Sequence, residues 1–113
     1  DVAYLEKTRP RPGEAEVRHV WGDVEGKTAV LVDDMIDSGG TLEGAVISLR
    51  NAGTKKILAM CTHAIFSDPA PERIKSCRIR IISINTIPQQ KHVWHSQLDA
   101  SGLFADAIRT LFF

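Results

Sequence analysis

The chain has 113 residues, of which 43% are hydrophobic and 25% are charged. This composition suits one compact domain over residues 1–113 and excludes a disordered chain, because enough apolar surface is present to form a core. Fourteen basic residues balance fourteen acidic ones, so no net charge draws the chain to nucleic acid or to an anionic membrane. We therefore expect neither partner, and any bound anion must be held by a local group of residues.

Targeting signals and metal motifs are missing from the sequence. No apolar run reaches the roughly 18–20 residues that span a bilayer, and the opening residues DVAYLEKTRPRP lack the apolar core of a signal peptide, so we expect a cytoplasmic protein. Cys61 and Cys77 show no metal-type spacing and are interpreted as buried or idle thiols, and no structural zinc is expected. The start at Asp1, without methionine, suggests a fragment.

The first part of the chain predicts a hairpin and a basic loop. Val2–Leu5 is typical of a short strand, while the next residues, 6–13, contain two prolines and a glycine that disfavour regular structure. Apolar and polar side chains mix over Glu16–Trp21, and residues 22–27 supply turn residues before the next apolar run. We expect a mobile loop at 6–13 and a hairpin turn at 22–27.

The middle of the chain alternates strands and helices. Thr28–Val32 is continuously apolar, which is typical of a central parallel strand buried on both faces, and Ile57–Cys61 repeats this pattern. A helix is predicted to open at Thr41, with Gly53 at the place of a C-terminal cap. Its apolar positions recur at helical spacing at Leu42, Ala45, Val46 and Leu49.

The last third continues this alternation. Pro69–Ile74 predicts a short helix and Ile79–Ile84 a strand, while residues 91–99 give no assignment. Ser101 is expected to cap a final helix whose apolar stripe is interpreted as ordinary core. The stripe comprises Leu103, Phe104, Ala107, Ile108 and Leu111. The pattern predicts an α/β fold with a mainly parallel sheet flanked by helices.

Residues 30–41, VLVDDMIDSGGT, combine the features of a ligand site. They lie between a predicted strand and a predicted helix, where ligands of open α/β sheets bind. Amides of residues 38–41 lack partners within the helix and glycines allow close approach, so a phosphate fits there. Asp33 and Asp34 would repel a phosphate but suit a vicinal diol or hydrated Mg²⁺. A sugar phosphate satisfies both parts.

The alternative is an ordinary turn in which Asp37 or Ser38 only caps the helix, the glycines relieve strain, and Asp33 and Asp34 face solvent. We favour the ligand site, because adjacent carboxylates at the end of a buried strand are costly without a partner.

The stretch VLVDDMIDSGGT resembles the PRPP-binding motif of the phosphoribosyltransferase superfamily, and within it that of the phosphoribosyl diphosphate synthetases. Residues 6–12 resemble their flexible catalytic loop and residues 22–27 their hairpin turn. Thr62-His63 and Phe66-Ser67 resemble the segment after their next strand. The similarity covers nearly the whole chain and implies the C-terminal half of such an enzyme, with a phosphoribosyltransferase-type fold.

The resemblance implies transfer of diphosphate from MgATP to the C1 hydroxyl of ribose 5-phosphate, giving PRPP and AMP. It also implies Mg²⁺ with ATP and substrate, and a homo-oligomer, whereas the ATP site of the family resembles nothing in this chain. The implied residues are Asp33, Asp34 and Asp37 for the ribose hydroxyls, Ser38, Gly39, Gly40 and Thr41 for the 5-phosphate, and Lys7 and Arg9 for catalysis.

The sequence departs from the family at three positions. Ser38 stands where threonine is common, Asp68 where glycine is common, and Asn85 where aspartate is common. Ser38 keeps its hydroxyl, so sugar binding is little affected. Asp68 adds a charge and Asn85 removes one, so these two changes leave oligomer geometry and regulation open. His63 could reach the site, yet a hydrogen-bonded loop histidine fits the sequence equally well.

Two other functions stay open. A phosphoribosyltransferase that consumes PRPP would share residues 33–41, but the base-recognising hood that it needs is not found. A non-catalytic, regulatory homologue would have no need of Lys7 and Arg9, although a basic pair in a loop is often only solvated.

Overall fold

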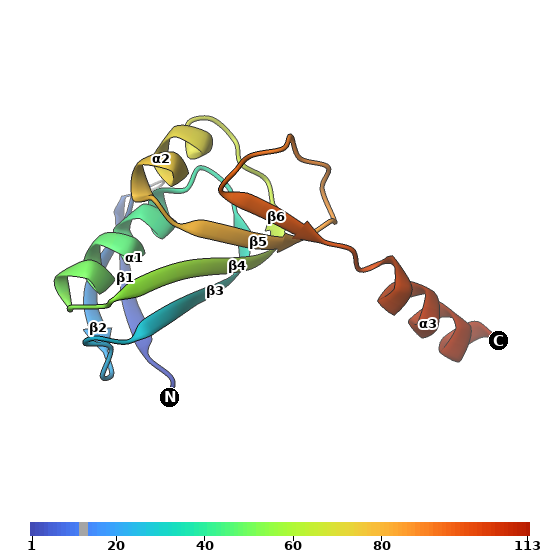
Figure 1. The fold of residues 1–113 in the computed structure, drawn as a ribbon, viewed down its shortest axis with the longest axis horizontal. Helices are drawn as coiled ribbons and strands as arrows, with labels where there is room; N and C mark the ends of the chain where they lie inside the picture. Colours follow the sequence, from blue (N-terminus) through green and yellow to red (C-terminus); the bar gives the residue numbers. More distant parts are fainter. Residues whose placement is uncertain (12–13) are drawn as a thin grey trace.

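The computed structural model describes residues 1–11 and 14–113, and the side chains of residues 1–8 and 19–113. These residues form a two-stranded hairpin, a four-stranded sheet and three helices (Figure 1). The strands are β1 Tyr4–Arg11, β2 Glu14–Trp21, β3 Thr28–Ile36, β4 Lys56–Ala64, β5 Arg80–Ile84 and β6 His95–Leu98. The helices are α1 Gly40–Asn51, α2 Ala70–Cys77 and α3 Ser101–Phe112.

The larger sheet has the order β3-β4-β5-β6, and all neighbouring strands are parallel. Helices α1 and α2 lie on one face of this sheet (Figure 1). The prediction of a mainly parallel sheet flanked by helices is therefore confirmed. Parallel pairing gathers the carboxyl ends of β3 and β4 at one edge, which is where the predicted ligand loop lies.

The core lies between the sheet and the two helices. All four predicted apolar positions of α1, namely Leu42, Ala45, Val46 and Leu49, are buried. Ile74 of α2 and Ile81 of β5 are fully buried and belong to the same core cluster. Cys61 and Cys77 are also buried, and this burial raises the pKa of both thiols. Their interpretation as buried thiols is confirmed.

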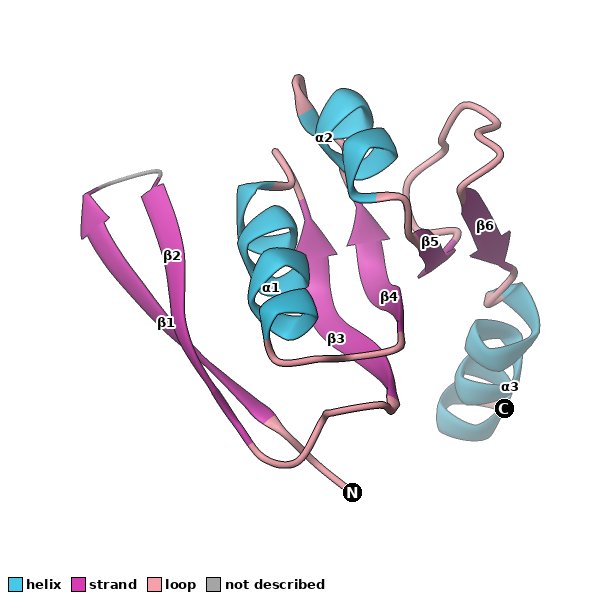
Figure 2. Cartoon of the chain, turned by 60° about the vertical axis from the view of Figure 1, so that its left-hand side comes forward, coloured by secondary structure: helices cyan, strands magenta, loops and turns pink. Residues whose placement is uncertain are grey.

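The hairpin differs from the prediction in the extent of its first strand and in the place of its turn. β1 continues through residues 6–11, which were expected to be irregular, and pairs with β2 in antiparallel fashion. The connection at 22–27 does not form a hairpin turn, because β2 pairs with β1 and β3 pairs with β4. The remaining predicted loop residues, 12–13, lie outside the described residues. Figure 2 shows the hairpin standing beside α1, apart from the parallel sheet.

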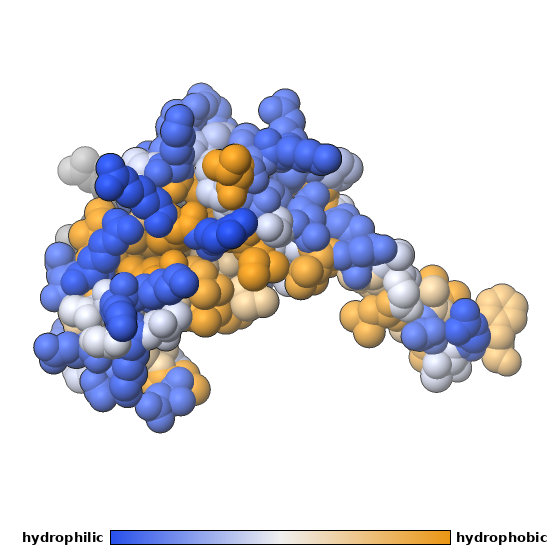
Figure 3. Space-filling view, in the orientation of Figure 1, coloured by the Kyte–Doolittle hydropathy of each residue, from blue (hydrophilic) through white to orange (hydrophobic). Residues whose placement is uncertain are grey.

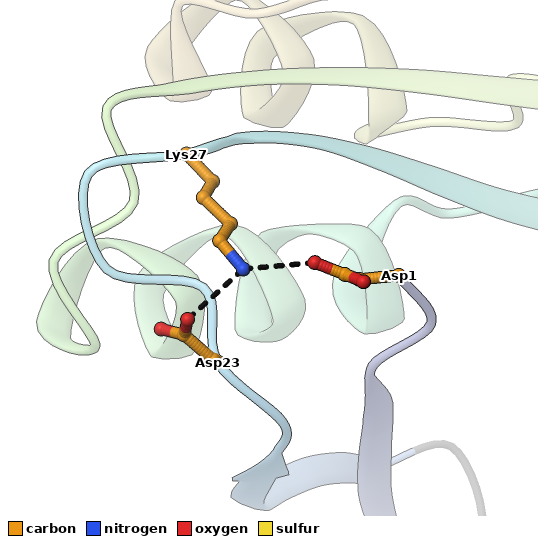
Figure 4. A network of polar contacts seen from close by, with 3 residues as sticks. All are labelled: Asp1, Asp23 and Lys27. Carbon is orange, nitrogen blue, oxygen red and sulfur yellow. Dashed lines mark hydrogen bonds and ion pairs between the residues drawn. The ribbon is translucent and has the colours of Figure 1, made fainter.

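The connection at 22–27 ties the base of the hairpin to the sheet. Lys27, just before β3, has its Nζ atom 3.0 Å from Asp1 Oδ2 and 2.9 Å from Asp23 Oδ2 (Figure 4). The three side chains are exposed, so these ion pairs are worth little individually. The chain connection itself sets which end of the hairpin meets the start of β3.

The second face of the sheet is open, which corrects the prediction for β3. Val30 and Val32 are 49% and 79% exposed, and β3 is an edge strand of the described sheet rather than a central one. Apolar residues form a continuous patch along the sheet in the space-filling view (Figure 3). The continuous apolar run thus indicates that both faces of β3 are suited to burial. The described helices cover only one of these faces.

The final helix also departs from the prediction. α3 begins at Ser101 as expected, but all its residues are exposed and it extends away from the body of the molecule (Figure 1). The apolar stripe on α3 is therefore not part of the core of the described chain. Ser101 is not the cap: Asp99 Oδ1 accepts a hydrogen bond from the Ser101 amide and Asp99 Oδ2 one from its hydroxyl. These bonds lower the pKa of Asp99.

No helix in the described part of the chain is long and apolar enough to cross a bilayer.

Candidate functional site

The candidate site is the connection between β3 and α1. β3 ends at Ile36 and α1 begins at Gly40, so Asp37, Ser38 and Gly39 form a three-residue loop. Gly39 is the N-cap residue and has a φ of 78°, a left-handed conformation that side chains disfavour. Glycine at this position therefore sets the direction in which the helix leaves the strand.

The loop leaves hydrogen-bond donors for a ligand. Gly39 is the N-cap residue of α1 and no side-chain cap hydrogen bond is made there by any described residue, so neither Asp37 nor Ser38 caps the helix. The other two features of the ordinary turn, a glycine in a left-handed conformation and exposed Asp33 and Asp34, are present. The first amides of a helix have no partner inside it, and the helix dipole makes this end favourable for an anion. The loop can therefore bind a phosphate through backbone amides, and the hydroxyls of Ser38 and Thr41 lie in the same stretch.

The carboxylates lie on the strand side of the loop. Asp33 and Asp34 are both exposed, which removes the sequence argument that burial requires a partner. Asp33 Oδ1 accepts a hydrogen bond from the Asp34 amide at 2.9 Å, and Asp34 Oδ1 accepts one from the Met35 amide at 2.7 Å. These bonds fix each carboxylate and leave its second oxygen, Oδ2, without a partner among the described residues. The free oxygens can accept hydrogen bonds from sugar hydroxyls.

The loop rests on α2 and the residues before it. The Ser67 hydroxyl donates a hydrogen bond to Asp37 Oδ1, and the Arg73 Nη1 atom donates one to the Ser38 carbonyl at 3.1 Å. Between them lies Ala70, whose Cα and Cβ atoms are each 3.6 Å from the position of a Cβ on Gly39. We call Ser67, Ala70 and Arg73 the support residues.

The support residues were missed by the sequence analysis. They are separated from the loop by about thirty positions, and nothing in the local sequence marks them as partners of the loop. Only Ala70 and Arg73 lie on α2, where a spacing of three residues places side chains on one face of the helix, whereas Ser67 precedes the helix.

His63 lies near the site but is paired with another residue. It sits opposite Met35 at the end of β4, and its Nδ1 atom is 2.9 Å from the Thr86 hydroxyl. That hydroxyl in turn donates to the Thr62 carbonyl at 3.2 Å. His63 is therefore a hydrogen-bonded histidine, as one of the two interpretations expected, but it lies at the end of β4 rather than in a loop.

The expected catalytic pair is on β1 rather than in an irregular loop. Lys7 is exposed and lies opposite Val17, next to an irregularity in the strand register. Arg9 also lies on β1, and its side chain is outside the described ones. Within the described residues, no hydrogen bond or ion pair joins Lys7 to the β3–α1 loop. Figure 2 shows the free end of the hairpin at the same end of the molecule as the tips of β3 and β4.

Two surface hollows flank the sheet. One, of about 190 Å³, lies on the open face and is lined in part by Asp33, Val32 and Met60. The other, of about 220 Å³, lies at the amino ends of β4 and β5, where Lys56 and Arg80 line it. Of these two hollows, the first adjoins the candidate site, because Asp33 lines it. The second lies at the amino ends of the strands, away from the end where parallel sheets bind ligands. Among the described residues, no three His, Cys, Asp or Glu side chains are grouped to hold a metal ion.

Comparison with protein families assigns almost the whole chain to one family. Residues 7–113 match the family described as the phosphoribosyl synthetase-associated domain. A ribose-phosphate pyrophosphokinase of Marinomonas is 44% identical over 96% of this chain, and one of Clostridium tetani is 40% identical over 98%. The chain covers 36% of each of these two proteins.

A solved structure gives the same result. The phosphoribosylpyrophosphate synthetase of Mycobacterium smegmatis superposes with a TM-score of 0.83 at 40% identity, covering 97% of this chain and 36% of that protein. The chain thus spans about a third of the length of its relatives. This share corrects the expectation of a C-terminal half, because the matched region is smaller than half of any of these enzymes.

Proposed function

Since the chain belongs to the phosphoribosyl synthetase-associated domain family, we propose that it is the ribose-5-phosphate-binding part of a ribose-phosphate diphosphokinase. Such an enzyme transfers diphosphate from MgATP to the C1 hydroxyl of ribose 5-phosphate and forms PRPP and AMP. The observation that carries the proposal is that the exposed carboxylates of Asp33 and Asp34, near the end of β3, are followed by a loop and a helix start that has no side-chain cap in the described structure.

In this proposal, the two sides of the loop bind the two ends of the sugar phosphate. Amides and hydroxyls of residues 38–41 bind the 5-phosphate, because donors at a helix start stabilise a dianion. Asp33 and Asp34 accept hydrogen bonds from the ribose hydroxyls through their free oxygens, and Asp37 borders the same site. Fixing both ends orients the C1 hydroxyl for attack on the β-phosphorus of ATP, which is a catalytic contribution in itself.

Lys7 and Arg9 are the proposed catalytic residues. Negative charge spreads over phosphate oxygens as the diphosphate moves from ATP to the sugar, and cations placed beside those oxygens lower the barrier. Both residues lie on β1, whose free end projects at the ligand end of the sheet (Figure 2). A movement of the hairpin towards the loop would deliver the two cations and exclude water.

The chemistry also calls for Mg²⁺. Mg²⁺ is usually held by one or two carboxylates together with substrate phosphates, and the exposed carboxylates of Asp33 and Asp34 fit that donor set. When bound, the ion neutralises charge on the phosphate oxygens. We further propose a cytoplasmic homo-oligomer, which the family resemblance implies.

A turnover assay tests the proposed function. The protein is expressed from its own gene at its natural length and incubated with MgATP, with and without ribose 5-phosphate. We expect AMP and PRPP to form in equal amounts and only with the sugar present. A transferase that consumes PRPP would form neither product here and would release diphosphate only when given PRPP and a nucleobase. A regulatory homologue would bind the sugar without turnover. Either result contradicts the proposal.

A matched pair of variants tests the site. Asp33→Asn should raise the KM for ribose 5-phosphate, because an amide accepts hydrogen bonds through one oxygen and carries no charge. Asp23→Asn is the control, since Asp23 is an exposed carboxylate that pairs with Lys27 on the connection before β3. Equal KM values for the two variants would remove Asp33 from the sugar site.

A further inference from the structure

Arg73 of α2 contacts the ligand loop in a way that neither the sequence motif nor the proposed reaction uses. Its Nη1 atom donates to the Ser38 carbonyl at 3.1 Å, and its Nε atom is 3.6 Å from Glu43 Oε2 in the first turn of α1. One guanidinium therefore bridges the loop and the helix that follows it. We propose that Arg73 is a positioning residue that aims the loop amides at the 5-phosphate, an inference that rests on the proposed function.

The geometry of the peptide bond supports this role. A trans peptide is planar, and its carbonyl and amide point in opposite directions. The Ser38 carbonyl is held towards Arg73, so the amide of Gly39 in the same peptide is directed away from α2. A hydrogen bond on one side of the peptide thus determines where the donor on the other side points.

The two glycines fit closely around this arrangement. A Cβ on Gly40 would lie 3.3 Å from Arg73 Nη1, which is tighter than an ordinary contact. A Cβ on Gly39 would lie 3.7 Å from Arg73 Cβ, and Ala70 is at a similar distance on the same helix. The guanidinium of Arg73 therefore packs tightly against the backbone at Gly40, whereas its stem is at an ordinary van der Waals distance from a Cβ at position 39.

The charge of Arg73 is already balanced. Glu43 pairs with it, and both side chains are 37% exposed. A cation that neutralises a carboxylate adds little net attraction for a phosphate, so its main effect is through the hydrogen bond that it donates to Ser38. This distinguishes Arg73 from Lys7, which is proposed to act on the reacting phosphates by its charge.

Four variants of the naturally expressed protein test the role. Arg73→Met removes the guanidinium and keeps the stem, and Arg73→Lys keeps a donor that can reach only one of the two partners. Lys75→Met is the matched control, because Lys75 is an exposed residue on the same helix. Glu43→Gln removes the ion pair while leaving the bond from Arg73 to Ser38. The measurements are kcat, the KM for ribose 5-phosphate, the KM for ATP, and Tm.

We expect Arg73→Met to raise the KM for ribose 5-phosphate about tenfold, which corresponds to about 1.4 kcal/mol and is typical of one hydrogen bond with a charged donor. The kcat, the KM for ATP and the Tm should stay close to those of Lys75→Met. Arg73→Lys should recover part of the loss, and Glu43→Gln should leave the KM for ribose 5-phosphate within about twofold of the unchanged protein.

Three results would overturn the positioning role while the proposed function stands. The KM of Arg73→Met could equal that of Lys75→Met, or the KM values for sugar and ATP could rise together, which indicates general damage. Glu43→Gln could lower the KM for ribose 5-phosphate severalfold, which would show that the freed charge of Arg73 acts on the phosphate directly. Absence of turnover by the unchanged protein would overturn both the function and this inference.

Discussion

Replacing Gly39 by alanine isolates the conformational requirement of the ligand loop. The residue has a φ of 78°, and an added Cβ would be 3.6 Å from Ala70, an ordinary van der Waals distance. Steric conflict with neighbours is therefore small, and the cost of Gly39→Ala is the cost of a left-handed residue, roughly 1–2 kcal/mol. This cost can be measured either as a lower free energy of unfolding or as weaker binding of ribose 5-phosphate.

If the loop keeps its conformation, the full cost appears in the free energy of unfolding. If the loop relaxes to a conformation that alanine prefers, the amides of residues 38–41 move, and the cost appears as weaker binding of ribose 5-phosphate. A loss of 1–2 kcal/mol in binding corresponds to roughly 5–30-fold in Kd. The two losses together should reach roughly 1–2 kcal/mol, however they are divided.

Urea denaturation and calorimetry with ribose 5-phosphate and Mg²⁺ measure the two losses. Gly26→Ala is the control, because Gly26 has a φ of 69° and its added Cβ would meet no described atom within 4 Å. The control should lose stability by a similar amount and keep its affinity for the sugar. If Gly39→Ala loses less than about 0.5 kcal/mol in stability and affinity combined, the left-handed conformation of Gly39 is not required for the site.

Three further predictions concern catalysis, packing and pH. Lys7→Ala should lower kcat far more than it changes the KM for ribose 5-phosphate, and equal effects on both in steady-state kinetics would contradict a role in the transition state. Ile74→Ala, at a fully buried position, should cost about 2–5 kcal/mol of unfolding free energy in urea titrations, whereas Val93→Ala, at a position 93% exposed, should stay within about 0.5 kcal/mol. Burial lowers the pKa of His95 from its ordinary 6.5, so its neutral form contributes stability that is present above pH 6.5 and lost as pH falls through the lowered pKa. The free energy of unfolding should therefore decrease as the pH is lowered below 6.5, and this decrease should be smaller in His95→Gln. If the pH dependence of the variant is unchanged, His95 is not its source.

The parts of the fold that follow from short-range patterns were predicted correctly. The helix α1 is fixed by apolar side chains at helical spacing and by Gly53 after its end, which has a φ of 82°. Its four predicted core positions are all buried. The motif at residues 30–41 was also placed correctly where a strand gives way to a helix, because the change from a continuous apolar run to helical spacing is visible in the sequence. The strand was predicted too short: β3 continues to Ile36, so Asp33 and Asp34 lie on the strand and not in the loop.

The hairpin was predicted wrongly because the rule applied to proline assumes a strand with neighbours on both sides. β1 pairs only with β2, so one side of it is unpaired in the described structure. A proline costs little where the missing amide would face solvent, and Pro10 is therefore compatible with β1. Local composition cannot reveal this, since the number of neighbours of a strand is a property of the sheet.

The exposure of β3 and α3 has a related cause. Periodicity reports which faces of an element are suited to burial, whereas the elements that cover them are set by the whole fold. Val32 continues the apolar run of β3 and is 79% exposed, and Leu111 continues the stripe of α3 and is 74% exposed. Both were expected in the core, and both lie where the described chain supplies no covering layer.

The same separation between local pattern and long-range support applies to the ligand loop. Its motif is contiguous, yet the described structure gives α1 no side-chain cap, so the loop is not held by its own side chains. Ser67 and Arg73 hold it instead, each about thirty positions away and brought close because the parallel pairing of β3 and β4 places the start of α2 beside the start of α1. Under the proposed function, residues that never meet the substrate should therefore change its affinity, and a sequence that kept the motif without such a support should bind ribose 5-phosphate less tightly.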